Sequence, residues 1–264
     1  MGASGSFVVA FHVRIARGRC HSKSVFDPDG RRLQNRNRRS WIDLWALFGL
    51  MLLVTACGVS KEEGIASVYA LAADESPESI DKIRKLTSHE DRDIRSTAIF
   101  ELAHLNVEDA PSFVRKGLQD EDSFVRATSA RCLGDVGTQE DVARLAAVLA
   151  GDPVKIVRKR AAEALTLLGG ADAVDALVGA LEDPMTKVRL AAIKGVARLE
   201  PGAGFAPLSR LLLEDPEWEV RVQAAGVLGS TGDEAALPIL ALAEQDPNEM
   251  VRAAAAAAQR AING

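Results

Sequence analysis

The chain of 264 residues contains few aromatic, histidine and cysteine residues. Phe, Trp and Tyr together account for 5% of the sequence, so a folded core has to be built mainly from small and aliphatic side chains. Only four His and three Cys are present, which leaves little material for a catalytic or metal-binding cluster. Apolar residues make up 47% and charged residues 26%, close to the values of globular proteins, so wholesale disorder is excluded.

Basic residues are concentrated at the start of the chain. Residues 1–57 hold nine Lys or Arg against three Asp or Glu, a net charge of +6. Residues 58–264 hold 23 basic and 34 acidic side chains, a net charge of −11. Because nucleic acids are held largely by positive charge, this acidic part argues against a nucleic-acid partner.

Residues 44–54 form a short apolar run. Its eleven residues are too few to cross a bilayer as a helix, which takes about 20 residues. Arg38 and Arg39 precede the run, and a linker rich in Gly, Ser, Lys and Glu follows it. A basic flank, a short apolar core and small residues at its end predict a secretory signal, the alternative being a buried helix of the folded domain.

The residues that end this run, Val54-Thr55-Ala56-Cys57, resemble the lipobox of bacterial lipoproteins, with Val54 in place of the more frequent Leu. The resemblance implies cleavage before Cys57 and transfer of a diacylglyceryl group to its sulfur, a step that suits a thiolate nucleophile. Several acyl chains would hold such a protein persistently at a membrane. The implied localisation is the bacterial cell envelope, on the periplasmic side of the inner or outer membrane.

The predicted signal is unusual in two respects. Its basic region of about 40 residues is long for a secretory signal, which leaves open a true start downstream of Met1. Residues 38–42, Arg-Arg-Ser-Trp-Ile, faintly resemble a twin-arginine export motif, but ordinary Sec export is favoured because the usual Phe-Leu-Lys tail is missing. The predicted organisation is an export signal over 1–56, the lipidated Cys and a linker or cap helix over 57–75, and a repeat domain over 76–264.

The cysteines agree with this organisation. Cys20 would be removed with the signal and Cys57 would be lipidated, so Cys132 would be left without an intramolecular disulfide partner. Cys132 falls within an apolar helical stretch and is interpreted as a small buried apolar residue.

The remainder of the chain repeats one unit six times. A β-branched residue followed by Arg recurs every 31 or 32 residues. Asp stands six residues before five of the six Arg residues, with His89 in that place in the first unit, and Pro follows four of these Asp residues. The six pairs are Ile94-Arg95, Val125-Arg126, Val157-Arg158, Val188-Arg189, Val220-Arg221 and Val251-Arg252. The five acidic residues are Asp120, Asp152, Asp183, Asp215 and Asp246.

Each repeated residue has a predicted role in a helix. Asp accepts a hydrogen bond from free N–H groups at a helix start, Pro fits the first helical position, and a left-handed Gly suits the helix end. Apolar residues recur at the Val and four, eight and eleven residues later, which is one helical face. A second helix, such as 171–182 or 139–150, leads to the next Asp, so the unit is a helical hairpin that must stack on its neighbours to bury its apolar face. The Gly residues in question are Gly134, Gly169 and Gly229.

Hairpins of this length, with Asp-Pro, then Val-Arg, then Ala-Ala-x-Ala-Leu-Gly, resemble HEAT repeats, most closely the short HEAT-like repeats of the phycobilin-lyase type. The resemblance implies an all-α fold, a right-handed α-α superhelix or solenoid of about six hairpins, with a cap helix near 61–73 and a final helix over 248–262. It also implies that Asp and Arg form a structural ladder between successive repeats. The ladder residues would be Asp152 and Arg158, Asp183 and Arg189, Asp215 and Arg221, and Asp246 and Arg252.

The activities of HEAT-like relatives find no counterpart in these residues. Deoxyhypusine hydroxylases of this type use several His-Glu pairs for iron, whereas only His89-Glu90 occurs here, and His104 would lie about 22 Å further along a helix. DNA glycosylases of this type need a basic, aromatic face, and nothing marks a tetrapyrrole site of a lyase. We therefore assign no catalytic residue, no metal site, no cofactor and no small-molecule substrate, and predict that the chain is not an enzyme.

The Val-Arg helices have an outward face that is expected to bind a partner. In HEAT solenoids one helix of each pair lines the concave side, and the residues three and six positions after the Val are expected to point outward there. The residues concerned are Thr128, Arg131, Arg160, Glu163, Ala191 and Lys194, with Arg198 extending the row. Arg131, Lys159, Arg160, Lys194 and Arg198 would form a basic ribbon that binds an acidic protein, the alternative being ordinary solvated charge. Trp218 is a candidate interface anchor, the alternative being packing against the neighbouring loop.

The sequence thus predicts a membrane-anchored, non-enzymatic scaffold that binds another protein in the bacterial envelope. The alternative is a lyase-like or chaperone-like HEAT subunit that acts on a cofactor-carrying protein. A third possibility is a soluble cytoplasmic adaptor whose lipobox is fortuitous.

Overall fold

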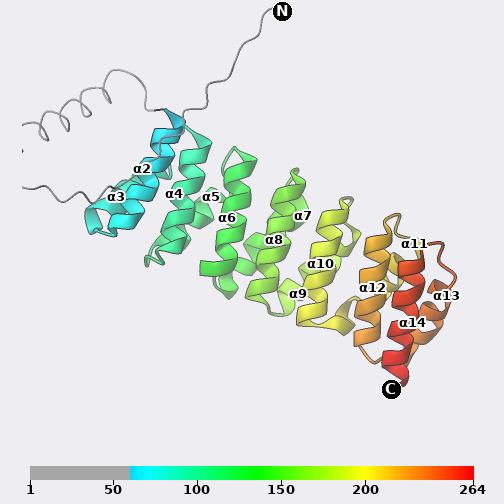
Figure 1. The fold of residues 1–264 in the computed structure, drawn as a ribbon. Coiled ribbons are helices and arrows are strands. Elements are labelled where there is room, and N and C mark those ends of the chain that lie inside the picture. The colour runs from blue at the N-terminus through cyan, green and yellow to red at the C-terminus, as the bar shows by residue number, and fades with distance from the viewer. Residues whose placement is uncertain (1–59) are drawn as a thin grey trace, which may run out of the picture. The chain divides into compact units, whose positions relative to one another are not determined.

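The computed structural model describes residues 60–264 (Figure 1). The predicted export signal, the lipidation residue Cys57 and the start of the linker lie outside the described residues. Residues 60–264 belong to one compact unit.

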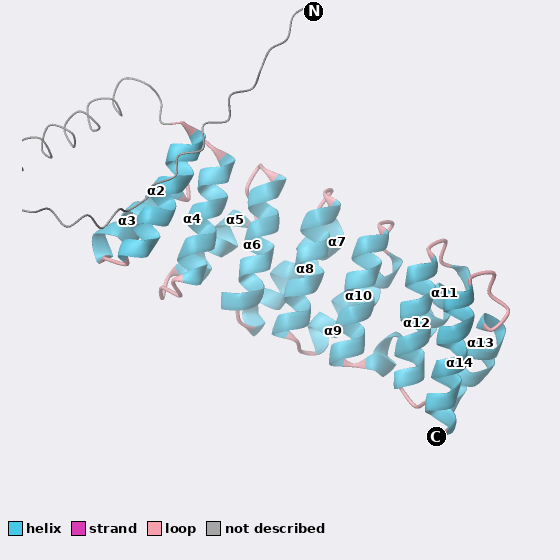
Figure 2. Ribbon diagram, in the orientation of Figure 1, coloured by secondary structure: helices cyan, strands magenta, loops and turns pink. Residues whose placement is uncertain are grey.

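The described residues form helices and contain no strand (Figure 2). Seven longer helices alternate with six shorter ones along the chain. The longer helices are α2 (Lys61–Asp74), α4 (Arg92–His104), α6 (Ser123–Val136), α8 (Lys155–Leu168), α10 (Thr186–Leu199), α12 (Trp218–Ser230) and α14 (Glu249–Asn263). The shorter helices are α3 (Pro77–Leu86), α5 (Ala110–Gly117), α7 (Val142–Gly151), α9 (Ala171–Gly179), α11 (Phe205–Glu214) and α13 (Leu237–Ala243). Four 3₁₀ turns, η1 (Gln139–Asp141), η2 (Ala180–Glu182), η3 (Pro201–Gly204) and η4 (Glu234–Ala236), adjoin the shorter helices.

The helices are arranged in two layers (Figure 1). The longer helices lie side by side in chain order in one layer, and each packs on the next. The shorter helices form the second layer behind them. The predicted all-α superhelical solenoid is therefore confirmed, with six hairpins from α2 to α13 followed by α14.

The core lies between the layers and follows the predicted helical face. In α8, Val157, Ala161 and Leu165 are completely buried, and in α10 the equivalent Val188 and Ala192 are too. Leucines of the shorter helices, such as Leu177 and Leu208, fill the other side of the core. Because a helix of one unit leaves its apolar face open until the next unit covers it, the core runs through successive repeats as one continuous cluster.

The first helices form a smaller core of their own. Val68 and Ala72 of α2 pack with Ile83 of α3 and with Ile94 and Ala98 of α4. Helix α2 occupies the segment predicted to be a cap helix, and its start is closed by a capping box between Ser60 and Glu63.

The predicted position of Pro in the Asp-Pro pairs is wrong. Helices α8, α10, α12 and α14 each begin three residues after the Asp, so Pro stands two residues before the first helical residue. The Asp carboxylate accepts the N–H of the residue two positions later, as Asp183 does from Met185 at 2.8 Å. The same carboxylate also binds an Arg of the preceding unit, Arg158 in the case of Asp183.

The glycines at the helix ends serve two different purposes. Gly169 has a positive φ of +70°, which favours glycine, but its ψ of −163° lies outside the left-handed helical conformation predicted for it. Gly134 and Gly229 instead lie inside α6 and α12, where neighbouring long helices approach closely. A Cβ on Gly229 would lie 2.5 Å from the Cβ of Ala258 in α14, so these two positions need Gly for packing rather than for backbone conformation.

Candidate protein-binding site

One edge of the solenoid carries a ladder of Arg–Asp ion pairs. In each pair, Nε and Nη2 of the Arg donate to the two carboxylate oxygens of an Asp in the next unit, at distances between 2.7 and 3.2 Å. The pairs are Arg95 with Asp120, Arg126 with Asp152, Arg158 with Asp183, Arg189 with Asp215, and Arg221 with Asp246. Within one unit, Arg158 Nη1 donates to the backbone oxygen of Asp152 at 2.8 Å. The carboxylate contact therefore joins successive units, and the contact within a unit uses the backbone.

The last ladder residue differs from the others. Arg252 donates to the backbone oxygens of Asp246 and Pro247, as in the preceding units. Within residues 60–264, however, no carboxylate is paired with it, and its side chain is exposed.

A further Arg–Asp pair lies outside the repeated positions. Arg115 of α5 binds both carboxylate oxygens of Asp141 at 2.7 and 2.9 Å, and Asp141 is completely buried. The same carboxylate accepts the N–H of Thr138. The guanidinium of Arg115 lowers the pKa of Asp141. Sequence reasoning missed this pair because Val114-Arg115, although a Val-Arg pair, falls outside the spacing of 31 or 32 residues and lies on a shorter helix. Thr138 and Asp141 nevertheless have the spacing of a capping box.

The predicted basic ribbon is divided among different surroundings. Arg131 lies over the ring of Phe100, with 4.6 Å between its guanidinium carbon and the ring centroid. Lys159 and Arg160 both bind Glu163, at 2.5 and 2.9 Å. Lys194 and Arg198 are exposed and have no ion-pair partner among the described residues.

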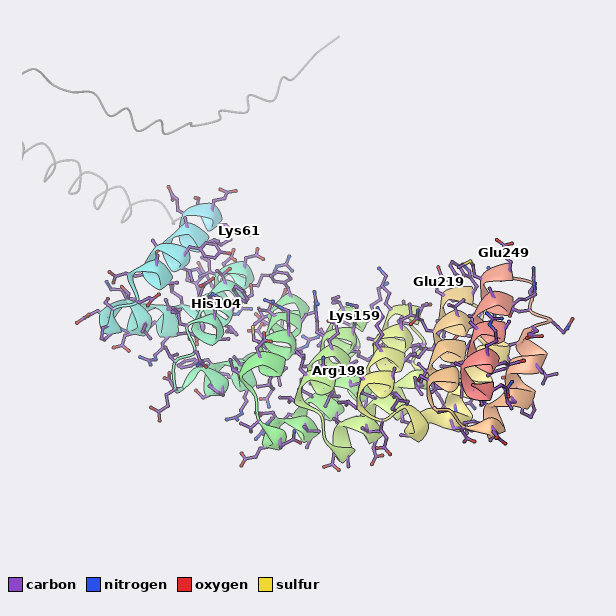
Figure 3. All side chains as sticks on the ribbon, turned by 60° about the horizontal axis from the view of Figure 1, so that its bottom comes forward. Lys61, His104, Lys159, Arg198, Glu219 and Glu249 are labelled. Atoms are coloured by element: carbon purple, nitrogen blue, oxygen red, sulfur yellow. The ribbon has the colours of Figure 1, made fainter. Side chains whose placement is uncertain are left out.

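A groove lies between α8 and α10, and three residues of the predicted basic ribbon line it together with Glu163. The groove has a volume of about 360 Å³ and opens on the exposed face of the longer helices. Lys159 and Glu163 line it from α8, and Lys194 and Arg198 from α10, with Lys159 and Arg198 labelled in Figure 3. We call this feature the α8–α10 groove. Its remaining lining residues are Thr166, Leu167, Lys187, Leu190 and Ala191.

The sequence prediction and the groove overlap only in part. Arg131 and Arg160 do not line the groove, and Ala191, predicted to face outward, is 8% exposed and forms part of its lining. Lys187 and Leu167 were missed because neither lies three or six residues after a Val. The signals that could have identified them are the charge of Lys187 and the place of Leu167 ten residues after Val157, which is equivalent to that of Arg198 after Val188.

Trp218 lies away from this groove. It is the first residue of α12 and 40% of its surface is exposed. The structure therefore leaves its side chain accessible, but does not join it to the cationic residues.

The thiol and imidazole groups of residues 60–264 lie in separate surroundings. Cys132 is 1% exposed, and burial raises the pKa of its thiol to about 11, which disfavours the thiolate. His89 precedes α4 rather than lying in it, and its Nδ1 accepts the N–H of Asp91 at 3.0 Å. His104 stacks on Phe100 with ring centroids 6.0 Å apart. Within residues 60–264, no three His, Cys, Asp or Glu side chains are grouped as ligands for a metal ion.

The described helices include none with both the length and the apolar character needed to span a bilayer.

Two layers of stacked helical hairpins, joined by a repeated Arg–Asp ladder, define an α-solenoid built from tandem repeats. The sequence profile of HEAT repeats matches residues 80–166, 147–204 and 174–260, and the chain belongs to the HEAT-repeat family.

Solved structures share this fold. The YibA protein of Escherichia coli is 18% identical with a TM-score of 0.54, over 86% of this chain and 100% of that one. An archaeal HEAT-like repeats protein from Thermococcus onnurineus is 15% identical with a TM-score of 0.52, over 76% of this chain and 92% of that one. No curated protein shows significant sequence similarity. At these identities the similarity establishes the fold alone.

Proposed function

We propose that the protein is a membrane-anchored, non-enzymatic scaffold of the bacterial cell envelope that binds another protein at the α8–α10 groove. The observation that carries this proposal is the presence of free cations beside apolar side chains on an otherwise acidic solenoid. Lys194 and Arg198 are exposed, and Leu167 at 52% exposure lies in the same groove. A concave surface with apolar lining and charged sides is suited to recognising a protein segment.

The chemistry of the groove supports binding rather than catalysis. Its only carboxylate, Glu163, is engaged by Lys159 and Arg160, and its hydroxyl, on Thr166, donates to the backbone oxygen of Ala162. The side chains left to contact a ligand are then cationic or aliphatic. Such groups recognise anionic and apolar side chains, and they do not form a nucleophile–base pair.

The lipid anchor rests on the sequence around Cys57. A basic flank, an apolar run of eleven residues and Val54-Thr55-Ala56-Cys57 support lipidation and export. The test is to produce the full chain and a Cys57→Ser variant in a bacterium fed radiolabelled palmitate. We expect label and membrane association in the original chain and neither in the variant. Equal membrane association of both, without label in either, would contradict the anchor.

Partner binding is tested by crosslinking in intact envelopes. The original chain and a Lys194→Glu, Arg198→Glu variant are crosslinked, purified and compared by mass spectrometry. We expect protein partners of the original chain to be lost from the variant, whereas a variant with Lys155→Glu and Arg210→Glu, outside the groove, retains them. A coloured cofactor that copurifies with the original chain would instead support the lyase-like alternative.

A further inference from the structure

Within the part of the chain that the structure describes, the groove cations without an ion-pair partner all come from one helix. Lys187, Lys194 and Arg198 lie along the exposed side of α10, with Leu190 between the first two. At 1.5 Å per residue, Lys187 and Lys194 are separated by about 10 Å along the helix axis, and Lys194 and Arg198 by about 6 Å. These separations are close to two turns and one turn of an α-helix.

The opposite wall, on α8, differs in charge. Its Lys159 is paired with Glu163, which also pairs with Arg160, so this wall offers little free positive charge. It offers instead the exposed apolar side chain of Leu167, which faces the same groove as Leu190. The groove therefore has unpaired positive charge on its α10 wall and paired charges on its α8 wall, with one leucine on each wall.

From this asymmetry we propose that the α8–α10 groove binds an amphipathic helix of the partner protein. The partner helix places an aliphatic side chain between Leu167 and Leu190. It places Asp or Glu side chains, about one and two turns apart, against Arg198, Lys194 and Lys187. The inference rests on the proposed function and specifies the segment that the scaffold recognises.

The spacing of the cations favours a helix over an extended segment. Side chains on one face of a strand recur at about 6.6 Å, so carboxylates on a strand would match the separation of Lys194 and Arg198 but not that of Lys187 and Lys194. A helix lying along the groove repeats at the pitch of α10 and can match both separations. Helices also recognise grooves of this kind through residues at i, i+3, i+4 and i+7.

The surroundings of the groove disfavour an anionic membrane as its occupant. Residues 58–264 carry a net charge of −11, which repels an anionic bilayer, whereas the cations are confined to the walls of a groove of about 360 Å³. A volume of this size accommodates a few side chains of a partner segment rather than a flat lipid surface.

The experiment places a photoreactive benzoylphenylalanine at Leu167 of the full chain, in cells that produce it. The matched control carries the same group at Leu213, which is also an exposed leucine but belongs to α11 in the other layer. After irradiation, the crosslinked peptide is sequenced by mass spectrometry. We expect the Leu167 adduct to be a segment with an aliphatic residue and at least three Asp or Glu residues at helical spacing.

Three results would overturn the inference: an adduct with lipid, an adduct with a segment that lacks this pattern, or no more adduct at Leu167 than at Leu213. A synthetic peptide copied from the crosslinked segment then provides a second measurement. It should gain helical circular dichroism on binding, and Lys194→Glu with Arg198→Glu should weaken its binding at least about tenfold. Lys159→Ala should change its binding less than about threefold, because Glu163 already neutralises Lys159.

Failure of this inference can be distinguished from failure of the proposed function. In one outcome, the Lys194→Glu, Arg198→Glu variant loses its envelope partners while the Leu167 adduct lacks an acidic helical segment. That result would support the scaffold function and contradict the binding of an amphipathic helix. If the variant retains all partners, the assignment of the α8–α10 groove as the partner-binding site is wrong.

Discussion

The ladder edge and the α8–α10 groove use the same kind of side chain under opposite conditions. At the ladder edge, Arg189 is 7% exposed, and its guanidinium group donates to both carboxylate oxygens of Asp215. In the groove, Lys194 and Arg198 are exposed and have no ion-pair partner among the described residues. Charge that is paired and buried holds successive units together, whereas charge that is exposed and unpaired is available to a partner.

The physical cost of removing a partner separates the two regions. A buried guanidinium without its carboxylate is desolvated, and no ion pair offsets the cost of that desolvation. Substitution of a ladder Asp should therefore reduce the free energy of unfolding. An exposed cation is already solvated, so its removal should leave stability nearly unchanged. Measurements of unfolding and of partner binding on the same variants therefore distinguish the two regions.

Acid should give the largest effect, because it protonates the carboxylates of more than one Arg–Asp pair. The guanidinium groups of Arg115 and Arg221 lower the pKa values of Asp141 and Asp246 in the folded chain. A lowered folded pKa gives stability that is present above the unfolded value of about 3.9 and is lost as pH falls through the folded value. The urea midpoint of unfolding should therefore fall steeply below about pH 4. The Lys194→Glu, Arg198→Glu variant should show the same dependence of the midpoint on pH. A flat profile between pH 4 and 2 would contradict the stabilising role of the pairs made by Asp141 and Asp246.

Breaking one buried ladder pair should come next. Asp215→Ala leaves Arg189 buried and unpaired, and we expect it to lower the free energy of unfolding by about 3–5 kcal/mol in urea denaturation. Replacing both partners with Arg189→Met and Asp215→Leu should cost much less, because no buried charge is left uncompensated. A double variant as unstable as Asp215→Ala would show that the pair contributes through more than charge.

The close packing of the longer helices should give the next largest effect. Gly229→Ala would place a Cβ 2.5 Å from that of Ala258, and we expect a loss of about 1–3 kcal/mol. Gly226→Ala on the same helix meets no atom within 4 Å and should stabilise by about 0.5–1 kcal/mol through helix propensity. Thermal unfolding of the two variants measures this difference, and equal effects would contradict the packing role of Gly229.

The end of the ladder should give the smallest effect at that edge. Arg252→Ala removes an exposed side chain that has no carboxylate partner among the described residues. We expect it to cost less than about 1 kcal/mol in urea denaturation, well below Asp215→Ala. A cost as large as that of the buried position would show that the Arg contributes chiefly through its backbone contacts rather than its ion pair.

The repeat made the fold predictable from the sequence. Residues such as Val157, Ala161 and Leu165 recur at helical spacing in successive units, so the hairpins and their stacking followed from local patterns. The Asp and Arg positions were also predictable. The place of Pro before the helix start was not, because the Asp has contacts with both the preceding and the following elements, such as those of Asp183 with Arg158 and Met185, and the pattern of one helix does not reveal them.

The groove was less predictable because it is made by two helices from different units. Lys194 and Arg198 could be placed on an outward face from the spacing within α10. The neutralisation of Lys159 by Glu163 depends on rotamers, and the contribution of Leu167 depends on how α8 and α10 pack. Such tertiary details cannot be derived from the period of one helix.

The most direct test of the account uses the Lys194→Glu, Arg198→Glu variant for two measurements on one preparation. Urea denaturation gives its free energy of unfolding, and crosslinking in envelopes gives its partners. We predict an unfolding free energy within about 0.5 kcal/mol of the original chain together with loss of the crosslinked protein. An equally stable variant that retains the same crosslinked protein would contradict the account.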